Sequence, residues 1–524
     1  MVLFESMLTL LVVALVLLQV SRRWPVPYPA MLALAGVVVA ALPWAPTIGI
    51  DPALALALFI APALLNAAFD FPPRHLRRYW LSLLSLAAVL VLLTTAAVAW
   101  LGMAMAGLPL AAAIALGAIV APPDAAVASA VLSRFELPRA TVSVLKGESL
   151  LNDAVALLIY TAAVAAASAA SGGASDAASQ ASAAAATPMA LWLAVPGGLM
   201  LGFVIGKIQV AVSAPLAGSL GGTLLEFVST FGAWVLAERL HLSAVLCVVA
   251  LAMTVARYAP ERTTPRDRVH SYSVWDTSVF VLNVLAFLLV GLQARGIVER
   301  LSYQELWPAI GFACTVLAVV VGMRIVWVLF YNRVLHFFSI KQGSHRVPTL
   351  SQGVLTSWCG MRGLVTLATA LALPQNFPKR DLIVLSALAV VLGTLVLQGA
   401  TLAPLIRLLR FDKDESFDKE LIKGRIALID AGEASVENES GDAAEALREM
   451  LKTDRKAVDA GKHPRAAAAI DDLTRRSIAA QRKKLADLRR SGAMEEDVFH
   501  TLEEELDWAE LAASPPSSFE LVEG

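Results

Sequence analysis

Asp153 is the residue whose setting best suits chemistry, because it is a carboxylate inside a long apolar run. It ends the segment Glu148-Ser149-Leu150-Leu151-Asn152-Asp153 and is followed by Ala-Val-Ala-Leu-Leu-Ile. An ionisable group at mid-membrane is costly unless it is paired or hydrated, so we interpret it as functional. Burial opposes its charge, so the carboxylate can exchange a proton near neutral pH, and when ionised it is a hard oxygen ligand for a small cation. One side chain can therefore hold either a proton or a cation.

Neighbouring polar residues follow the helical repeat of this segment. Glu148 and Asn152 are four residues apart and share one helix face, while Ser149 and Asp153 share the next face. The alternative interpretation is a cluster of capping residues at a helix entrance, with no transport role.

A second unusual segment is Ala121-Pro122-Pro123-Asp124, in the middle of another apolar run. Two consecutive prolines remove two backbone donors and clash with the preceding turn, so they predict a helix break. Broken backbone at membrane depth is tolerated where it is buried in protein or lines a cavity, and transporters place such breaks at ion sites. Asp124 would neutralise the N-terminal end of the following half-helix. The alternative is a simple kink with Asp124 as a cap.

A third charged residue inside an apolar segment is Arg362, in Trp358-Cys359-Gly360-Met361-Arg362-Gly363. A guanidinium cannot shed its charge, so Arg362 requires a carboxylate partner. Glu148 is the natural candidate, and we predict a buried structural ion pair between the two. Removing one partner of such a pair costs about 3–5 kcal/mol.

The composition predicts that these residues lie in a membrane. Of the 524 residues, 57% are hydrophobic and 16% are charged, whereas soluble domains carry about 25% charged residues. The net charge of −1 gives no indication of nucleic-acid binding. A window of about 19 residues predicts about thirteen spans and hence an all-α polytopic membrane protein. The span centres lie near Leu11, Gly36, Leu58, Leu90, Gly117, Leu157, Gly202, Gly232, Ala250, Leu285, Val319, Val365 and Val390.

Loop charge predicts the orientation of the chain. One set of alternate loops holds roughly 16 basic residues and the other about five, and the richer set is expected in the cytoplasm. This places the start of the chain outside and its end in the cytoplasm. The richer set contains Arg22, Arg23, Arg74, Arg77, Arg78, Arg134, Arg139, Lys146, Lys207, Arg257, Arg262, Arg266, Arg268, Arg333, Lys341 and Arg346. The poorer set contains Arg239, Arg295, Arg300, Lys379 and Arg380.

Composition also predicts two domains, a membrane domain over residues 1–410 and a charged, mostly helical cytosolic tail over residues 411–524. Within the first, the Ala/Ser-rich segment Ala165 to Thr187 is expected to be a helix end that runs into a flexible outer loop. Within the tail, Ser514 to Gly524 is expected to be disordered. The basic stretch Arg475 to Arg490 is interpreted as a solvated helix face, with a partner or anionic membrane surface as the alternative.

At these motifs the chain resembles the monovalent cation:proton antiporter family, which includes the NhaP-type proteins of prokaryotes and the animal sodium/proton exchangers. The resemblance covers roughly residues 1–410. Its most specific part is Gly147-Glu148-Ser149-Leu150-Leu151-Asn152-Asp153, in which the Asn-Asp pair is typical of the electroneutral branch. The Ala121–Asp124 break, Gly360–Gly363 and the segment Trp275 to Leu292 support it.

The resemblance implies a fold of thirteen helices with inverted repeats and two crossed, broken helices. Asp153 would exchange the proton and the cation, with Ser149 as an additional cation ligand. Asn152 would hold the crossing together, and Asp124 would offset the helix ends at Pro122 and Pro123. The implied protein is a homodimer in the cell (inner) membrane, binding Na+ and H+ and needing no cofactor.

Two departures from the family pattern concern the cation. Pro123 stands where the family usually has threonine, so a hydroxyl ligand is missing. Asn66 stands where many members have an acidic residue, so its amide carbonyl is the predicted ligand there and adds no charge. Asp153, Ser149 and Asn66 form the predicted transient site for the cation. Na+ is the expected substrate, with K+ or Li+ as alternatives.

Three other function classes compete with exchange. A cation channel needs a continuous polar pore, and one titratable buried carboxylate suits coupled exchange better. An intramembrane enzyme needs a nucleophile with a base or a metal cluster, and neither Gly-x-Ser-x-Gly nor His-Glu-x-x-His occurs in the sequence. A purely structural role does not explain the buried charges. We therefore predict a secondary antiporter and not an enzyme.

Overall fold

The computed structural model divides the chain into two compact units, Met1–Lys413 and Asp414–Glu523, here named the membrane unit and the tail unit. All secondary structure in the described ranges is helical, without strands. The described residues are 2–21, 27–42, 51–132, 135–171, 177–216, 218–259, 264–300, 302–342, 349–411, 415–459, 469–491 and 496–512.

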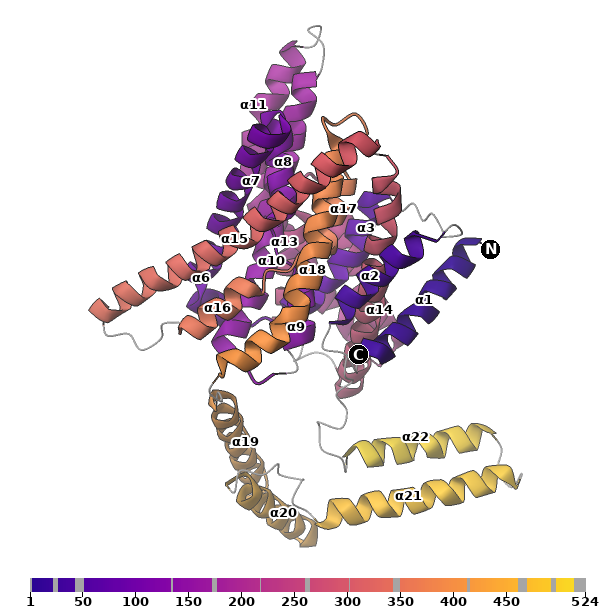
Figure 1. Ribbon diagram of the computed structural model, residues 1–524. Helices are drawn as coiled ribbons and strands as arrows, with labels where there is room; N and C mark the ends of the chain where they lie inside the picture. The colour runs from indigo at the N-terminus through magenta and orange to yellow at the C-terminus, as the bar shows by residue number, and fades with distance from the viewer. Residues whose placement is uncertain are drawn as a thin grey trace. The chain divides into compact units, whose positions relative to one another are not determined.

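The membrane unit is a bundle of helices of very different lengths (Figure 1). Its first half contains α1 (Val2–Ser21), α2 (Tyr28–Ala40), α3 (Pro52–Ala55), the π-helical turn η1 (Leu56–Ile60), α4 (Ala61–Phe69), α5 (Pro73–Arg78), α6 (Trp80–Leu84), the π-helical turn η2 (Ser85–Val89), α7 (Leu90–Ala106), α8 (Leu110–Val120), α9 (Ala125–Leu132) and α10 (Arg139–Ser171). Its second half contains α11 (Ala177–Ser213), the 3-10 turn η4 (Ala214–Leu216), α12 (Leu220–Arg239), α13 (Ala244–Tyr258), α14 (Pro265–Val298), α15 (Tyr303–Gln342), α16 (Leu350–Trp358), α17 (Leu364–Leu371) and α18 (Arg380–Leu409).

Every predicted span centre lies within one of these helical elements, from Leu11 in α1 to Val390 in α18. In the described part of the chain, 7 helical runs are long and apolar enough to cross a membrane by length and composition. Shorter apolar helices, such as α2 and α13, account for most of the other predicted spans. The all-α membrane fold is confirmed, and the count of thirteen spans stays a prediction.

The segment Ala165–Thr187, predicted as a helix end followed by a loop, is mostly helical. Helix α10 continues to Ser171 and α11 begins at Ala177, so the connection spans only residues 172–176, which lie outside the described part. Alanine has the highest helix propensity of all residues, which explains why an Ala-rich segment extends the two helices. The predicted disorder after Ser514 also lies outside the described residues.

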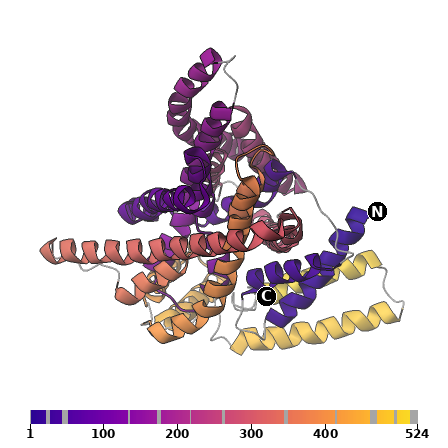
Figure 2. The same ribbon diagram turned by 45° about the horizontal axis from the view of Figure 1, so that its top comes forward.

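Helix α18 runs through the middle of the membrane unit in both views (Figures 1 and 2), and 67% of its most apolar stretch is buried.

Glycine residues let helices α2 and α14 approach each other closely. A Cβ atom at Gly291 in α14 would lie 2.1 Å from the carbonyl oxygen of Ala33 in α2. A Cβ atom at Gly36 in α2 would lie 2.4 Å from the carbonyl oxygen of Leu288. Small residues at such contacts are the usual means of packing helices in lipid.

The tail unit consists of two helix pairs, α19 (Ser416–Ser435) with α20 (Asp442–Asp459), and α21 (Ala469–Arg490) with α22 (Glu496–Ala512). Arg455 of α20 forms an ion pair with Asp430 of α19. Arg482 of α21 donates from Nε to Glu510 of α22 at 2.9 Å and also pairs with Asp507. Part of the predicted basic stretch is therefore used to join two tail helices.

Candidate functional site

Two broken helices meet inside the membrane unit. Helix α8 ends at Val120 and α9 begins at Ala125, with the two prolines between them. Helix α16 ends at Trp358 and α17 begins at Leu364. We call the segments 121–124 and 359–363 the first and second break. They are joined by a main-chain hydrogen bond in which Asp124 N donates to Met361 O at 2.7 Å. The break predicted at Pro122 and Pro123 is present, and its partner is the glycine-rich segment around Met361.

Asn152 on α10 ties a third helix to the first break. Its Nδ2 donates to the carbonyl oxygen of Pro123 at 2.9 Å, and its side chain is fully buried. The carbonyl of Pro123 lies in the break, between the end of α8 and the start of α9. The amide of Asn152 gives this buried carbonyl a hydrogen-bond partner, so the residue is positioned to hold the crossing.

The carboxylate of Asp124 lies against the second break. A Cβ atom at Gly363 would fall 1.9 Å from Asp124 Oδ2, so only glycine fits there. Gly363 immediately precedes α17, and Asp124 itself immediately precedes α9. Helix N-termini carry partial positive charge, which a nearby carboxylate offsets. Asp124 is thus placed beside the starts of two half-helices, where the sequence predicted one.

Asp153 follows Asn152 on α10 and is 6% exposed. Among the described residues it accepts no hydrogen bond and forms no ion pair, although it interacts electrostatically with Asp124. Ser149 lies one helical turn before it and is half-buried. Burying a lone carboxylate without a partner is unfavourable, so such a group favours binding either a proton or a cation.

The predicted ion pair between Glu148 and Arg362 is wrong. Glu148 pairs instead with Arg324 of α15, whose Nη1 and Nη2 donate to its two carboxylate oxygens at 2.5 and 2.9 Å. Both side chains are 1% exposed. Two parallel bonds of this kind match the planar guanidinium to the carboxylate, and they make the pair strong and directional.

Arg362 bonds to main-chain carbonyls instead. It donates from Nε to Val120 O at 3.1 Å, from Nη2 to Ala121 O at 3.2 Å and from Nη1 to Gly360 O. These first two carbonyls end helix α8, whose last carbonyls lack helical partners and carry partial negative charge. The guanidinium therefore acts as a cap for the first broken helix, which explains why no carboxylate is required.

Arg324 does the same for the other broken helix. Besides pairing with Glu148, it donates from Nη2 to Thr356 O at 3.0 Å and to Cys359 O at 3.4 Å, at the end of α16. Each broken helix thus ends at a buried arginine. Sequence reasoning missed Arg324, although a signal existed, because it is the only charged residue between Glu305 and Arg333.

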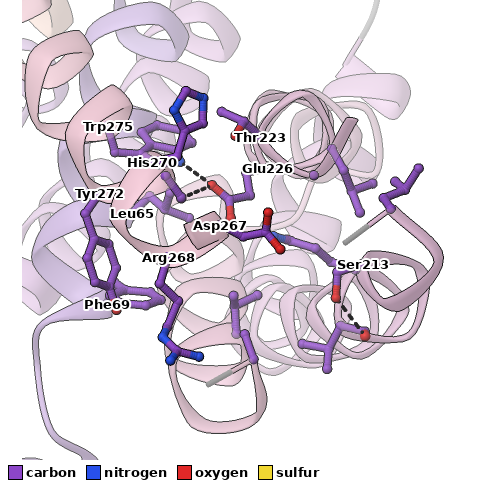
Figure 3. A pocket seen from close by; sticks show the side chains of 18 of the residues that line it. Leu65, Phe69, Ser213, Thr223, Glu226, Asp267, Arg268, His270, Tyr272 and Trp275 are labelled. Atoms are coloured by element: carbon purple, nitrogen blue, oxygen red, sulfur yellow. Dashed lines mark hydrogen bonds between the residues drawn. The ribbon is translucent and has the colours of Figure 1, made fainter. Parts of the chain in front are cut away.

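Asn66, the third predicted cation ligand, lines a cavity of about 300 Å³ formed with residues of α11, α12 and α14. Figure 3 shows this cavity, with Glu226 of α12 at its wall. Glu226 accepts hydrogen bonds from Ser271 Oγ at 2.6 Å and from Trp275 Nε1 at 2.7 Å. The described lining includes neither Ser149 nor Asp153. The structure therefore does not bring the three predicted ligands to one cavity.

Comparison with known proteins points to one family. The profile of the transmembrane sodium/hydrogen exchanger family matches residues 8–408. An uncharacterized Na+/H+ exchanger of Mycobacterium tuberculosis is 28% identical over 528 residues, covering 95% of this chain and 94% of that protein. A sodium, potassium, lithium and rubidium/H+ antiporter of Bacillus subtilis is 29% identical over 420 residues, covering 76% of this chain and 61% of that protein.

The fold agrees with this assignment. The sodium proton antiporter MjNhaP1 of Methanocaldococcus jannaschii superposes with a TM-score of 0.57 at 18% sequence identity, covering 79% of this chain and 99% of that structure. Since the family profile spans most of the chain and includes both breaks and α10, the chain belongs to the transmembrane sodium/hydrogen exchanger family.

Proposed function

We propose that this protein is a secondary antiporter that exchanges one monovalent cation, with Na+ as the principal substrate, for one H+. The observation that carries the proposal is Asp153, a buried carboxylate without an ion-pair partner among the described residues, one position after the asparagine that holds the crossing. Such a group is stabilised when a proton or a cation occupies it. Alternation between the two, on opposite sides of the membrane, gives coupled exchange.

The neighbouring charges have supporting roles in this proposal. Asp124 offsets the N-terminal ends of α9 and α17, and it stays ionised through the cycle. Arg324 and Arg362 offset the C-terminal ends of α16 and α8, while Glu148 balances Arg324. Only Asp153 changes its occupant. Ser149, one turn away, supplies a neutral oxygen to the cation. The amide carbonyl of Asn66, which lines a separate cavity, is proposed as a further neutral ligand.

K+ and Li+ are the alternative substrates, and they have support from one comparison. The Bacillus subtilis relative is named as an antiporter of sodium, potassium, lithium and rubidium. We further propose that the protein lies in the cell membrane as a homodimer, with its start outside and its tail in the cytoplasm, following the charge asymmetry of the loops.

The test is exchange in proteoliposomes with an imposed proton gradient, in which Na+, K+ and Li+ are added separately and the internal pH is recorded. The expected result is cation-driven proton movement that saturates and requires the opposing gradient. Asp153→Asn should abolish this proton movement. Its matched control is Glu299→Gln, which removes an exposed carboxylate of the same unit and should leave the movement unchanged. Cation flux that continues without any proton movement would instead identify a channel.

A further inference from the structure

A second cavity of the membrane unit, of about 560 Å³, lies beside the short helix α5 and the last turn of α13. Three arginines line it, Arg74 and Arg77 from α5 and Arg257 from α13. All three side chains are exposed, and none forms an ion pair with a described carboxylate. Asp70 is the one acidic residue in the lining, so the cavity carries a net positive charge.

The rest of the lining is apolar, with Phe69, Phe71 and Met253 among its residues. A cavity lined by three arginines and by apolar side chains suits a ligand that combines an anion with hydrocarbon. Guanidinium groups prefer phosphate oxygens because they can donate two parallel hydrogen bonds. This chemistry differs from that of the proposed exchange site, where the carboxylate of Asp153 binds a cation.

The surroundings of the cavity resemble a membrane–water interface. Trp80 begins α6 two residues after α5 and is 56% exposed, and Leu81 and Leu84 on the same helix are 53% and 51% exposed. On the α13 side, Lys207 Nζ lies 3.1 Å from the centroid of the Tyr258 ring. Tryptophan and tyrosine beside basic residues mark the headgroup level of a bilayer, and exposed leucines next to them face acyl chains.

We propose that this cavity binds the phosphate headgroup of an anionic glycerophospholipid, with Arg74, Arg77 and Arg257 as its ligands and the exposed face of α6 beside its acyl chains. Basic pockets between membrane helices on the cytoplasmic side are suited to such headgroups. Phe69 and Asp70 line both this cavity and the one that contains Asn66. The bound lipid therefore contacts residues that also line the Asn66 cavity.

The test uses the full-length protein in detergent, with native mass spectrometry and thermal unfolding as the two measurements. Added probes are phosphatidylglycerol, phosphatidylcholine and inorganic phosphate, each alone. Phosphatidylglycerol is expected to remain bound and to raise the unfolding midpoint, while phosphatidylcholine does neither. The same stabilisation by inorganic phosphate alone, or by both lipids equally, would overturn the proposal.

The variant for this test combines Arg74→Gln, Arg77→Gln and Arg257→Gln. It should bind phosphatidylglycerol about a hundredfold more weakly, roughly fivefold for each arginine. The matched control removes Arg239, Arg300 and Lys379, three basic residues of the opposite loops that do not line the cavity. If the triple variant fails to fold, Arg77→Gln alone should still show the fivefold loss. Unchanged binding in a folded variant would contradict the assignment.

Discussion

Glu148 and Arg324 are 176 residues apart in the chain and form a doubly hydrogen-bonded ion pair in which each side chain is 1% exposed. The pair connects α10, which carries Asp153, to α15 and through Arg324 to the end of α16. It is therefore a link between the exchange residue and the second broken helix. Water cannot reach either side chain, so it cannot solvate the charge that remains when one partner is removed. Loss of the pair therefore affects the stability of the fold.

Removing either partner should destabilise the protein by about 3–5 kcal/mol, because the other charge is left buried and unpaired. We expect Arg324→Ala and Glu148→Ala to lower the thermal unfolding midpoint strongly, and the double variant to be milder than the sum. Breaking the exposed pair of Arg295 and Glu299 is the control and should cost at most about 1 kcal/mol. Additive effects at Glu148 and Arg324 would contradict the pairing.

Asp153→Asn should abolish exchange in a protein that still folds, because the amide keeps the shape of the side chain but cannot exchange a proton. The measurement is cation-driven proton movement in proteoliposomes, together with the elution profile of the purified variant. Wild-type exchange rates in the folded variant would show that another residue is the exchange site, and Asp124 would be the next candidate.

Gly291→Ala should destabilise the packing of α14 on α2 by about 1–3 kcal/mol, since the added methyl group would overlap the Ala33 carbonyl. Gly296 in the same helix is the matched control, because a Cβ atom there would meet nothing within 4 Å. Gly296→Ala should leave the unfolding midpoint equal or raise it slightly. Equal effects of the two substitutions would show that α2 and α14 do not pack as closely as described.

Acidic pH should raise the concentration of cation needed for half-maximal exchange, because protons and cations compete for Asp153. If one proton competes with one cation, the half-saturating cation concentration rises by at most about tenfold for each pH unit of acidification. The rate should also fall at alkaline pH, where few protons are available for the return step. The measurement is the half-saturation for Na+ over a series of pH values. A half-saturation independent of pH would exclude a single shared site.

Exchange should be electroneutral, because Asp153 carries either one proton or one monovalent cation and the two loaded forms have equal charge. A membrane potential acts on net charge moved, at about 2.3 kcal/mol per charge per 100 mV. The Na+ gradient that balances a fixed proton gradient should therefore not change when the potential is clamped with K+ and valinomycin. A balance point that shifts steadily with potential would mean that a second proton moves, and Asp124 would be its carrier.

The sequence was most informative where one residue type is out of place for its surroundings. Prolines at 122 and 123 and carboxylates at 124 and 153 stand in apolar runs, so their positions in the chain alone identify the first break and the buried acid. The all-α fold follows from the length of those runs. These are local signals, which do not depend on how the helices are arranged.

The partner of Glu148 could not be predicted in the same way. Both Arg324 and Arg362 lie in apolar segments, and which of them reaches α10 depends on the packing of α15 and α16, which no local pattern specifies. Arg362 also finds its partners in the free carbonyls of α8, and those exist only because the helix is broken. A buried guanidinium can thus be satisfied without a carboxylate, by main-chain carbonyls at a helix end.

The main-chain bond from Asp124 to Met361 has a mechanical consequence. Both breaks share it, Asn152 fastens α10 to the first break, and Arg324 and Arg362 fasten the ends of α16 and α8. Moving one of these helices away from the others would leave several buried polar groups unsatisfied at once, each at a cost of about 1–3 kcal/mol. The crossing should accordingly travel as a single rigid block during the transport cycle, with the bending and sliding confined to the helices around it.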